Sequence, residues 1–323
     1  MTLGVVIPCH AQERFLPRTM AALERALDGR VWRGVLVFAT ETGGPGLEAL
    51  GPHWTVVRPA GVTRPLTPGA ARNLGLAACE GAAVLFLDAD VELERAWIDR
   101  ALAVLESDPS IAGLWGRLEE WFVDAGRERP GARDLYRVGD GDHDVPYLAT
   151  LALYRRDALA RAGAYEPRLN SEEDFELGLR LRRAGFRMRT LAPLAARHWS
   201  APRPSFAEYG RRWRTGLCFG PGQALRQYLG RPGFLELLRR NAHYFAMLAL
   251  WLAAPIAFAT GGASALRMWA VAPLALWLVM TLRKRDARLA LHSLTTWTVM
   301  AAGTVVGLVR GGSPAPAPVE EAA

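Results

Sequence analysis

The sequence of 323 residues predicts an α/β fold, with a mainly parallel sheet flanked by helices and with hydrophobic helices near the C-terminus. Up to residue 90, apolar runs of strand length alternate with segments whose apolar residues recur at helical spacing. Strands that alternate with helices are joined by right-handed crossovers, which make the strands parallel. Beyond residue 240, three long segments carry almost no charge, which is typical of membrane helices.

The individual elements follow from these patterns in chain order. Strands are expected at residues 3–8, 31–38, 53–58 and 82–87, and helices at 15–27, 70–79 and 93–105. Later strands are expected within 111–122 and 147–155, a helix over 171–184, and a mobile loop over the polar residues 124–144. Ligands bind beyond the carboxyl ends of parallel strands, so we expect residues 8–13, 40–44 and 88–90 to meet there.

Two carboxylates, Asp88 and Asp90, end the apolar run AAVLFLDADVE. Side chains two apart on an extended segment point the same way, so both acids can face one point beyond the strand. Carboxylates in such a place suit a hard divalent cation that is shared with phosphate oxygens. The alternative is that the two residues cap the helix expected over 93–105.

A second acidic cluster, Glu172, Glu173 and Asp174, lies in the first turn of the helix expected over 171–184. One of these acids could take a proton from an acceptor hydroxyl. In the alternative, Ser171 caps the helix and Asp174 completes a capping box. A third cluster in the expected loop could be a metal site or, more simply, a solvated turn; it comprises Asp140, Asp142, His143 and Asp144.

Taken together, these motifs resemble family 2 glycosyltransferases over roughly residues 3–200. The resemblance rests on VVIPCH at the start, GAARNLG at 69–75, Asp88-Ala89-Asp90, LALYRRDALARAGAYEP at 151–167, and Glu173-Asp174 leading into LGLRLRRAG. It implies a GT-A fold, in which a Rossmann-like nucleotide-binding half joins an acceptor-binding half. It also implies the transfer of a sugar from a nucleotide-sugar donor with inversion of the anomeric centre.

The resemblance implies roles for individual residues. Asp88 and Asp90 would hold Mg²⁺ or Mn²⁺ against the donor diphosphate, and Asp174 would be the catalytic base, with Glu173 beside it. His198 would reach the metal or a phosphate. The alternative, equally expected, is that His198 only ends a strand and has no role in the site. The expected donor contacts are Pro8, His10, Glu13, Glu41, Arg72, Asn73 and Asp88.

Two segments depart from the family pattern. Residues 38–42 read Phe-Ala-Thr-Glu-Thr where the family has an Asp-Asp-Ser-type turn, so only Glu41 remains to contact the base and ribose. Residues 209–213 keep only the Arg-Trp of a Gln-x-x-Arg-Trp motif. This favours a single transfer over processive synthesis.

Three hydrophobic segments predict a multi-pass membrane protein. Residues 241–266 and 289–309 contain no charged residue and are long enough to cross a bilayer core of ~30 Å, whereas 268–282 needs the preceding residues from 263. The alternative for each is a buried core helix. Arginine and lysine concentrate before the first segment and within 283–288, which by the positive-inside rule places the N-terminal domain at the cytoplasmic face of the cell membrane.

These observations divide the chain into a catalytic domain (1–203), an interfacial helical segment (204–240), a membrane domain (241–310) and a disordered tail (311–323). The mixture of arginines and aromatic residues over 206–229 suits a helix lying on anionic headgroups, or one whose aromatic residues pack under the catalytic domain. On the first interpretation, Arg211, Arg212 and Trp213 lie at the membrane surface, where a lipid-linked or glycan acceptor would arrive.

The composition narrows the choice of partners. The net charge of +7 comes without a nucleic-acid recognition motif, so membrane lipids are the expected partner and nucleic acid is not.

Three scattered cysteines indicate reduced thiols, and residues 1–8 lack the features of a signal peptide. Two other functions stay open: a catalytically silent membrane-bound subunit, and a sugar nucleotidyltransferase, which the absence of a Gly-rich basic loop after the first strand disfavours.

Overall fold

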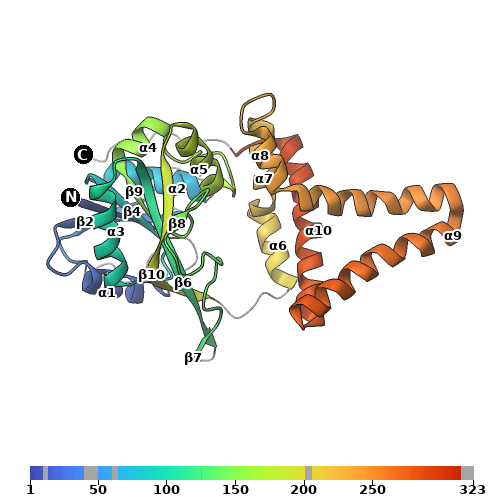
Figure 1. Ribbon diagram of the computed structural model, residues 1–323, viewed down its shortest axis with the longest axis horizontal. Coiled ribbons are helices and arrows are strands. Elements are labelled where there is room, and N and C mark those ends of the chain that lie inside the picture. The colour runs from blue at the N-terminus through green and yellow to red at the C-terminus, as the bar shows by residue number, and fades with distance from the viewer. Residues whose placement is uncertain (10–13, 40–49, 60–64, 125, 201–205, 314–323) are drawn as a thin grey trace. The chain divides into compact units, whose positions relative to one another are not determined.

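The computed structural model describes residues 1–9, 14–39, 50–59, 65–124, 126–200 and 206–313 (Figure 1). The chain forms two compact units. The first comprises Met1–Leu169, Glu173–Pro204 and Ser313–Ala323, and the second comprises Asn170–Glu172 and Ser205–Gly312.

The first unit is built on one mixed sheet. Its strands in the described residues are β1 (Leu3–Cys9), β2 (Trp32–Phe38), β3 (Trp54–Val57), β4 (Ala83–Leu87), β5 (Val91–Leu93), β6 (Ile111–Asp124), β7 (Arg127–Pro130), β8 (His143–Asp144), β9 (Leu151–Arg155) and β10 (Arg187–Ser200). They lie in the order β3-β2-β1-β4-β9-β6-β10-β5, with β7 beside β6 and β8 beside β10. The strands β3, β2, β1 and β4 are parallel, as predicted, and β9 is antiparallel to both β4 and β6.

Five helices of the first unit flank this sheet: α1 (Leu16–Ala26), α2 (Pro68–Ala78), α3 (Arg95–Ser107), α4 (Arg156–Ala162) and α5 (Glu173–Arg183). The chain passes from β1 to β2 and from β3 to β4 in opposite directions across the sheet, so right-handed crossovers place α1 and α2 on opposite faces. The predicted α/β fold is therefore confirmed. The expected loop over 124–144 is partly wrong, because β7 and β8 form there.

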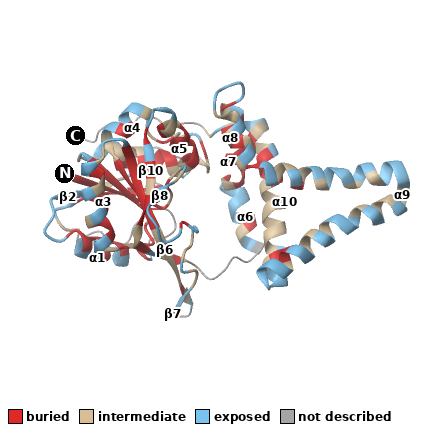
Figure 2. Ribbon diagram, viewed as in Figure 1, coloured by how far each residue is buried: buried red, intermediate tan, exposed pale blue. Residues whose placement is uncertain are grey.

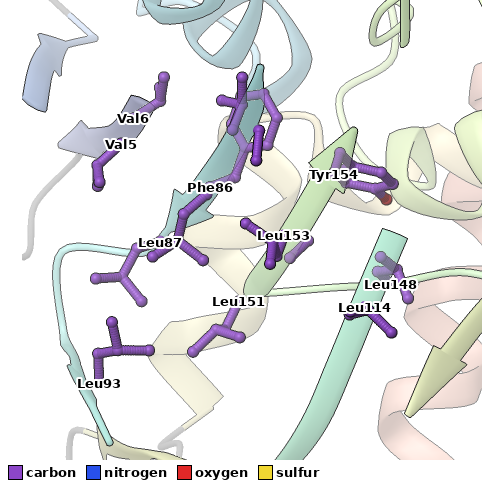
Figure 3. Close-up of a cluster of buried hydrophobic side chains, with 14 of the residues drawn as sticks. Val5, Val6, Phe86, Leu87, Leu93, Leu114, Leu148, Leu151, Leu153 and Tyr154 are labelled. Atoms are coloured by element: carbon purple, nitrogen blue, oxygen red, sulfur yellow. The ribbon is translucent and has the colours of Figure 1, made fainter. Parts of the chain in front are cut away.

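The core of the first unit lies between the sheet and its helices. Buried residues concentrate on the central strands and on the inward faces of the helices (Figure 2). Figure 3 shows Phe86 and Leu87 on β4 beside Leu151 and Leu153 on the neighbouring β9. This apolar run is fully buried, which explains why the polar residues that follow it are delivered at a defined point at the end of β4.

The second unit is helical. Its helices are α6 (Phe206–Arg214), the 3₁₀-helix η2 (Leu217–Phe219), α7 (Gly220–Gln227), α8 (Phe234–Arg240), α9 (Ala242–Lys284) and α10 (Ala287–Arg310). Residues 206–229, expected as one helix, are instead divided into α6, η2 and α7. Gly216 causes the first break, because it adopts a left-handed conformation with φ of 75°.

Two helices of the second unit, α9 and α10, are long and apolar enough to cross a membrane. The 43-residue α9 is interrupted at Gly262, whose backbone is not helical, and in Figure 1 it folds back on itself. The two arms are joined where Trp269 donates a hydrogen bond to the carbonyl of Leu250. The interruption at Gly262 lies directly before residue 263, from which the second apolar segment was expected to extend.

Candidate functional site

Asp88 and Asp90 occupy a tight turn between β4 and β5. The backbone N–H of Asp88 donates to the carbonyl of Thr150 at 3.1 Å, and the N–H of Trp199 donates to the carbonyl of Asp90 at 2.8 Å. The helix α3 begins only at Arg95, with Glu94 at its N-cap. The alternative prediction, that the two aspartates cap this helix, is therefore wrong.

The carboxyl of Asp90 is buried and makes few hydrogen bonds. Asp90 is 8% exposed, and its Oδ1 has no hydrogen-bond partner among the described residues. The imidazole Nε2 of His198 lies 3.6 Å from Oδ1, while Nδ1 of the same ring contacts the hydroxyl of Ser200 at 3.0 Å. Burial, reinforced by the charge of Asp88, raises the pKa of the Asp90 carboxyl to about 6.

Arg72, on α2, connects the two acidic segments. Its Nη2 lies 3.4 Å from Oδ1 of Asp88, and its Nη1 lies 2.7 Å from Oε1 of Glu173 and 3.6 Å from Oδ1 of Asp174. Burial opposes the charge of this guanidinium, but the surrounding carboxylates outweigh that effect and raise the pKa of Arg72 further above its already high value. One permanent cation thus holds three acids that lie far apart in the sequence.

Glu173 and Asp174 open α5, where acidic side chains also favour the positive end of the helix dipole. Because the helix begins at Glu173, Ser171 does not occupy the N-cap, and its hydroxyl donates to the carbonyl of Leu217 instead. The capping-box alternative is therefore wrong. The two acids differ in access, since the Glu173 side chain is 8% exposed and that of Asp174 is 21% exposed.

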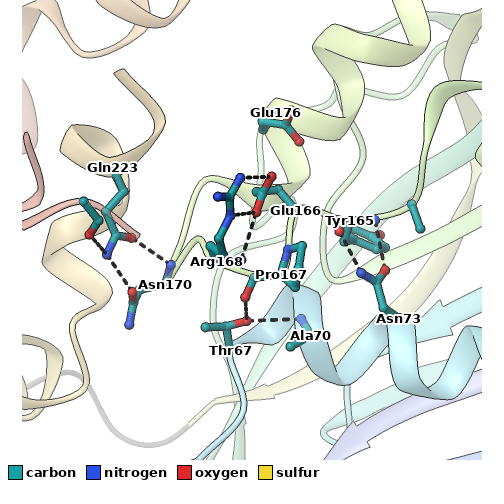
Figure 4. Close-up of polar contacts among 12 residues, drawn as sticks. Thr67, Ala70, Asn73, Tyr165, Glu166, Pro167, Arg168, Asn170, Glu176 and Gln223 are labelled. Carbon is teal, nitrogen blue, oxygen red and sulfur yellow. Dashed lines mark hydrogen bonds and ion pairs between the residues drawn. The ribbon is translucent and has the colours of Figure 1, made fainter. Parts of the chain in front are cut away.

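Asn73 and Thr67 hold the backbone of Tyr165 and Pro167 (Figure 4). The amide of Asn73 donates to the carbonyl of Tyr165 at 2.7 Å and accepts from its N–H at 3.0 Å. Thr67 caps α2 through the N–H of Ala70 and donates to the carbonyl of Pro167. The ring of Tyr165 then lies 5.2 Å from the guanidinium carbon of Arg72. Asn73 acts here as a support for Tyr165 and Arg72.

Sequence reasoning missed Tyr136 and Thr150. Their hydroxyl groups are hydrogen-bonded to each other, and Thr150 has a left-handed φ of 58°, which is strained for a β-branched residue. Burial, together with the charges of Asp88, Asp174 and Asp90, raises the pKa of Tyr136, so its phenol stays protonated. No sequence motif singles out either residue. Thr150 reaches Asp88 because β9, which follows it, pairs with β4, and Tyr136 joins them through its hydrogen bond with Thr150.

The remaining predicted site residues fall into two groups. Pro8 lies in β1, whereas His10, Glu13 and Glu41 are outside the described residues. Arg211 and Arg212 belong to the second unit, where both pair with Glu208 at 2.6 and 2.9 Å, and Trp213 is 39% exposed. These contacts hold the two guanidinium groups along one side of α6.

The acids of the third cluster are used in ion pairs. Asp142 lies 2.6 Å from Arg100, and Asp140 lies 3.1 Å from Arg117. Asp144 lies 3.2 Å from Arg189. This arrangement agrees with a solvated turn and not with a metal site.

No group of three or more His, Cys, Asp and Glu side chains placed to hold a metal ion occurs in the part of the chain that the structure describes. Asp88, Asp90 and His198 nevertheless offer two carboxylates and an imidazole, which are ligands that Mg²⁺ and Mn²⁺ accept. The orphaned, buried Oδ1 of Asp90 is the atom that a cation would satisfy. These residues fit a divalent ion whose coordination is completed from outside the chain.

Comparison with known proteins identifies relatives of the first unit. Residues 4–163 match the family described as Glycosyl transferase family 2. The pre-mycofactocin glycosyltransferases of two Mycobacterium tuberculosis strains are 35% identical over 134 residues, which is 38% of this chain and 28% of theirs. The aligned part therefore spans less than a third of these relatives.

Among solved structures, the mannosyltransferase PcManGT from Pyrobaculum calidifontis, in complex with GDP-Man and Mn²⁺, is 17% identical. The match covers 95% of this chain and 86% of that protein, with a TM-score of 0.59. The S. aureus TarS fragment 1–349 in complex with UDP-GlcNAc is also 17% identical over 67% of this chain and 66% of that one, with a TM-score of 0.47. The likeness to PcManGT supports the same fold for this chain.

Proposed function

Because this chain belongs to glycosyl transferase family 2 and has a GT-A fold, we propose that it transfers a sugar from a nucleotide-sugar donor to an acceptor hydroxyl or phosphate. The observation that carries the proposal is the contact of Arg72 with Asp88 on one side and with Glu173 and Asp174 on the other. Asp88, which would bind the donor, and Asp174, which could accept a proton, thereby lie around one guanidinium. Displacement at a bound sugar needs such groups held close together.

Within this site we assign the base to Asp174. Glu173 is almost fully buried and forms the shorter contact with Arg72, so its carboxylate is engaged in holding that cation. Asp174 is more exposed and lies farther from Arg72, which leaves it better placed to accept a proton from an acceptor hydroxyl. Attack on the face opposite to the leaving nucleotide inverts the anomeric centre.

Asp88, Asp90 and His198 would hold a divalent cation, Mg²⁺ or Mn²⁺. When bound, such an ion neutralises charge that develops on the departing diphosphate. Asp90 contributes the buried oxygen that accepts no hydrogen bond from the described residues, and Ser200 orients the ring of His198 toward it. The mannosyltransferase of similar fold was solved with Mn²⁺, which supports this assignment.

The remaining donor contacts are assigned to Pro8, Arg72 and Asn73, together with His10, Glu13 and Glu41 from outside the described residues. Arg72 would draw the diphosphate toward Asp88, and Asn73 would act through Tyr165, which it positions. Relatives of this fold were solved with GDP-Man and UDP-GlcNAc, so uridine and guanosine donors are the first to test.

We further assign the protein to the cytoplasmic face of the cell membrane as a multi-pass protein. Support comes from the apolar helices α9 and α10 and from the arginines and lysine that flank them. Arg211, Arg212 and Trp213 on α6 would lie at the headgroups, where a lipid-linked or glycan acceptor arrives. The corresponding domains are 1–203, 204–240, 241–310 and the tail 311–323.

The test is a donor screen on the full chain purified in detergent. Release of UDP, GDP or dTDP from sugar nucleotides is followed with Mn²⁺, with Mg²⁺ and with EDTA, with and without membrane lipid extract. We expect slow hydrolysis of one donor that is lost with EDTA and in Asp90→Asn. Exposed Arg33→Ala serves as the matched control and should keep full turnover.

Absence of turnover and of nucleotide binding with every donor would overturn the proposal and favour a silent membrane-bound subunit. Turnover that survives both EDTA and Asp90→Asn would retain the transferase but overturn its metal dependence.

A further inference from the structure

We propose that a groove on the first unit is a second carbohydrate-binding site, separate from the Asp88–Asp90 turn, which takes two or three units of an oligosaccharide. The groove lies between α1, β5 and the ends of β6, β7 and β10, and it encloses about 480 Å³. This volume falls within the range of small-molecule sites, ~300–1,000 Å³. None of its lining residues has a role in the transfer chemistry assigned above.

Two indoles form the apolar surface of the groove. The ring of Trp199 is 3% exposed and lies deep, and the ring of Trp121 lies 5.9 Å from it at an angle of 46°. Trp121 is only half-buried, so part of its ring is open to a ligand. An aromatic ring of this kind packs against the C–H face of a sugar while its surroundings supply hydrogen bonds.

Charged groups of both signs surround these rings. The guanidinium of Arg18 lies 4.2 Å above the Trp199 ring and is held there by Glu92 at 3.4 Å and by Glu128 at 2.7 Å. Arg25 and Arg197 line the groove as well, and Arg197 lies over the ring of Trp121. The groove therefore presents hydrogen-bond donors and acceptors beside an aromatic face.

This combination favours a sugar over other classes of ligand. Hydroxyl groups both donate and accept, so they can serve the guanidinium and the carboxylate groups together. Three arginines and two glutamates line the groove, and both glutamates pair with Arg18. A phosphate could use Arg25 and Arg197, but it would be repelled by the two carboxylates and would leave the indoles unused. A lipid chain would take water away from the charged groups of the lining and offer them no hydrogen bonds, which is costly.

The groove opens away from the proposed metal ligands. Trp199 and His198 are neighbours on β10, and adjacent side chains of a strand point to opposite faces. His198 faces Asp90, so Trp199 faces α1 on the other side of the sheet. The two sites are connected through the backbone, by the hydrogen bond from Trp199 N–H to the carbonyl of Asp90.

Ligand-observed saturation-transfer NMR on the full chain in detergent tests the inference. The probes are cellobiose, maltose, chitobiose and α-1,2-mannobiose, each at about 5 mM, a concentration suited to a millimolar Kd. EDTA is present and nucleotide is absent, so the readout is independent of catalysis. We expect a signal from at least one disaccharide.

The decisive variant is Ala21→Trp, which fills the groove from an exposed position on α1 and spares the core. We expect it to weaken binding at least about tenfold. Ala160→Trp, at an exposed position on α4 away from the groove, is the matched control. Trp121→Leu is the second blocking variant if Ala21→Trp does not fold, as judged by its Tm.

Four outcomes would overturn the inference. Three of them are the absence of signal from all four sugars, a signal unchanged in the blocking variants, and a signal lost in Asp174→Asn, which would place the sugar at the transfer site. Competition by inorganic phosphate at equal concentration would assign the groove to anions and would also overturn it. Failure of the donor screen leaves this binding test unaffected.

Discussion

Nη1 of Arg72 lies 2.7 Å from Oε1 of Glu173, and this buried ion pair joins α2 to the first turn of α5 across 101 positions of sequence. Asp88 and Asp174 contact the same guanidinium at longer distances. The guanidinium of Arg72 therefore connects the end of β4, through Asp88, with the start of α5. The arrangement makes Arg72 a structural centre of the site as well as a candidate donor contact.

Replacing Arg72 should destabilise the first unit. Arg72→Ala leaves the buried Glu173 without its cation, and removing one partner of a buried ion pair typically costs about 3–5 kcal/mol. Arg72→Lys keeps the charge but offers a single nitrogen where two reach separate carboxylates, so an intermediate loss is expected. Chemical unfolding followed by tryptophan fluorescence measures both. Equal stability of Arg72→Ala and the unchanged protein would refute the buried ion pair.

Substitutions of Asp174 and Glu173 should affect different kinetic constants. Asp174→Asn should lower kcat by about 10²–10⁴, the usual contribution of a general base, with little change in the KM of the donor. Glu173→Gln should instead lower stability and raise the donor KM, because Arg72 loses its nearest carboxylate. Steady-state kinetics with the donor found in the screen distinguish the two. A loss of kcat in Glu173→Gln alone would reverse the roles.

Asp90→Asn should stabilise the metal-free protein while it abolishes turnover. The Oδ1 of Asp90 is buried without a hydrogen-bond partner among the described residues, and such groups cost about 1–3 kcal/mol. The amide has nearly the same shape and no charge. In EDTA the variant should therefore show a higher Tm than the unchanged protein, and saturating Mn²⁺ should raise the Tm of the unchanged protein only. A lower Tm of Asp90→Asn in EDTA would contradict this interpretation.

Replacing the glycines at which α10 packs against α7 and η2 should destabilise the second unit. A Cβ on Gly307 of α10 would lie 2.0 Å from the carbonyl oxygen of Phe219, and one on Gly222 of α7 would lie 1.9 Å from that of Thr304. Gly307→Ala and Gly222→Ala should each cost about 1–3 kcal/mol as the backbones are forced apart. Gly210→Ala on α6 is the matched control, because nothing lies within 4 Å of its Cβ. Thermal denaturation in detergent measures all three, and a normal Tm in both tight variants would exclude the packing.

Local sequence patterns predicted much of the first unit. Each strand from β1 to β4 lies at or close to the residues expected, and all but β3 are largely buried. The Asp88–Asp90 turn follows the last of these strands, and the order of motifs identified the family before any tertiary contact was known. By contrast, the position of Ser171 outside α5 was missed. A serine three residues before an acid resembles a cap, whether or not the helix begins there.

The sequence by itself determined that this protein has an α/β unit with an acidic pair at the end of a buried strand, a second acidic pair at the start of a helix, and apolar helices behind them. These are properties of segments of some ten residues, in which side-chain period and polarity decide the local structure. Only the tertiary structure decided that Arg72 joins the acids, that Tyr136 lies near them, and that Trp121 and Trp199 line a groove. Those contacts join residues far apart in the sequence: Trp121 and Trp199 meet because β6 pairs with β10, and Arg72 of α2 meets Glu173 of α5. No local pattern encodes such pairings.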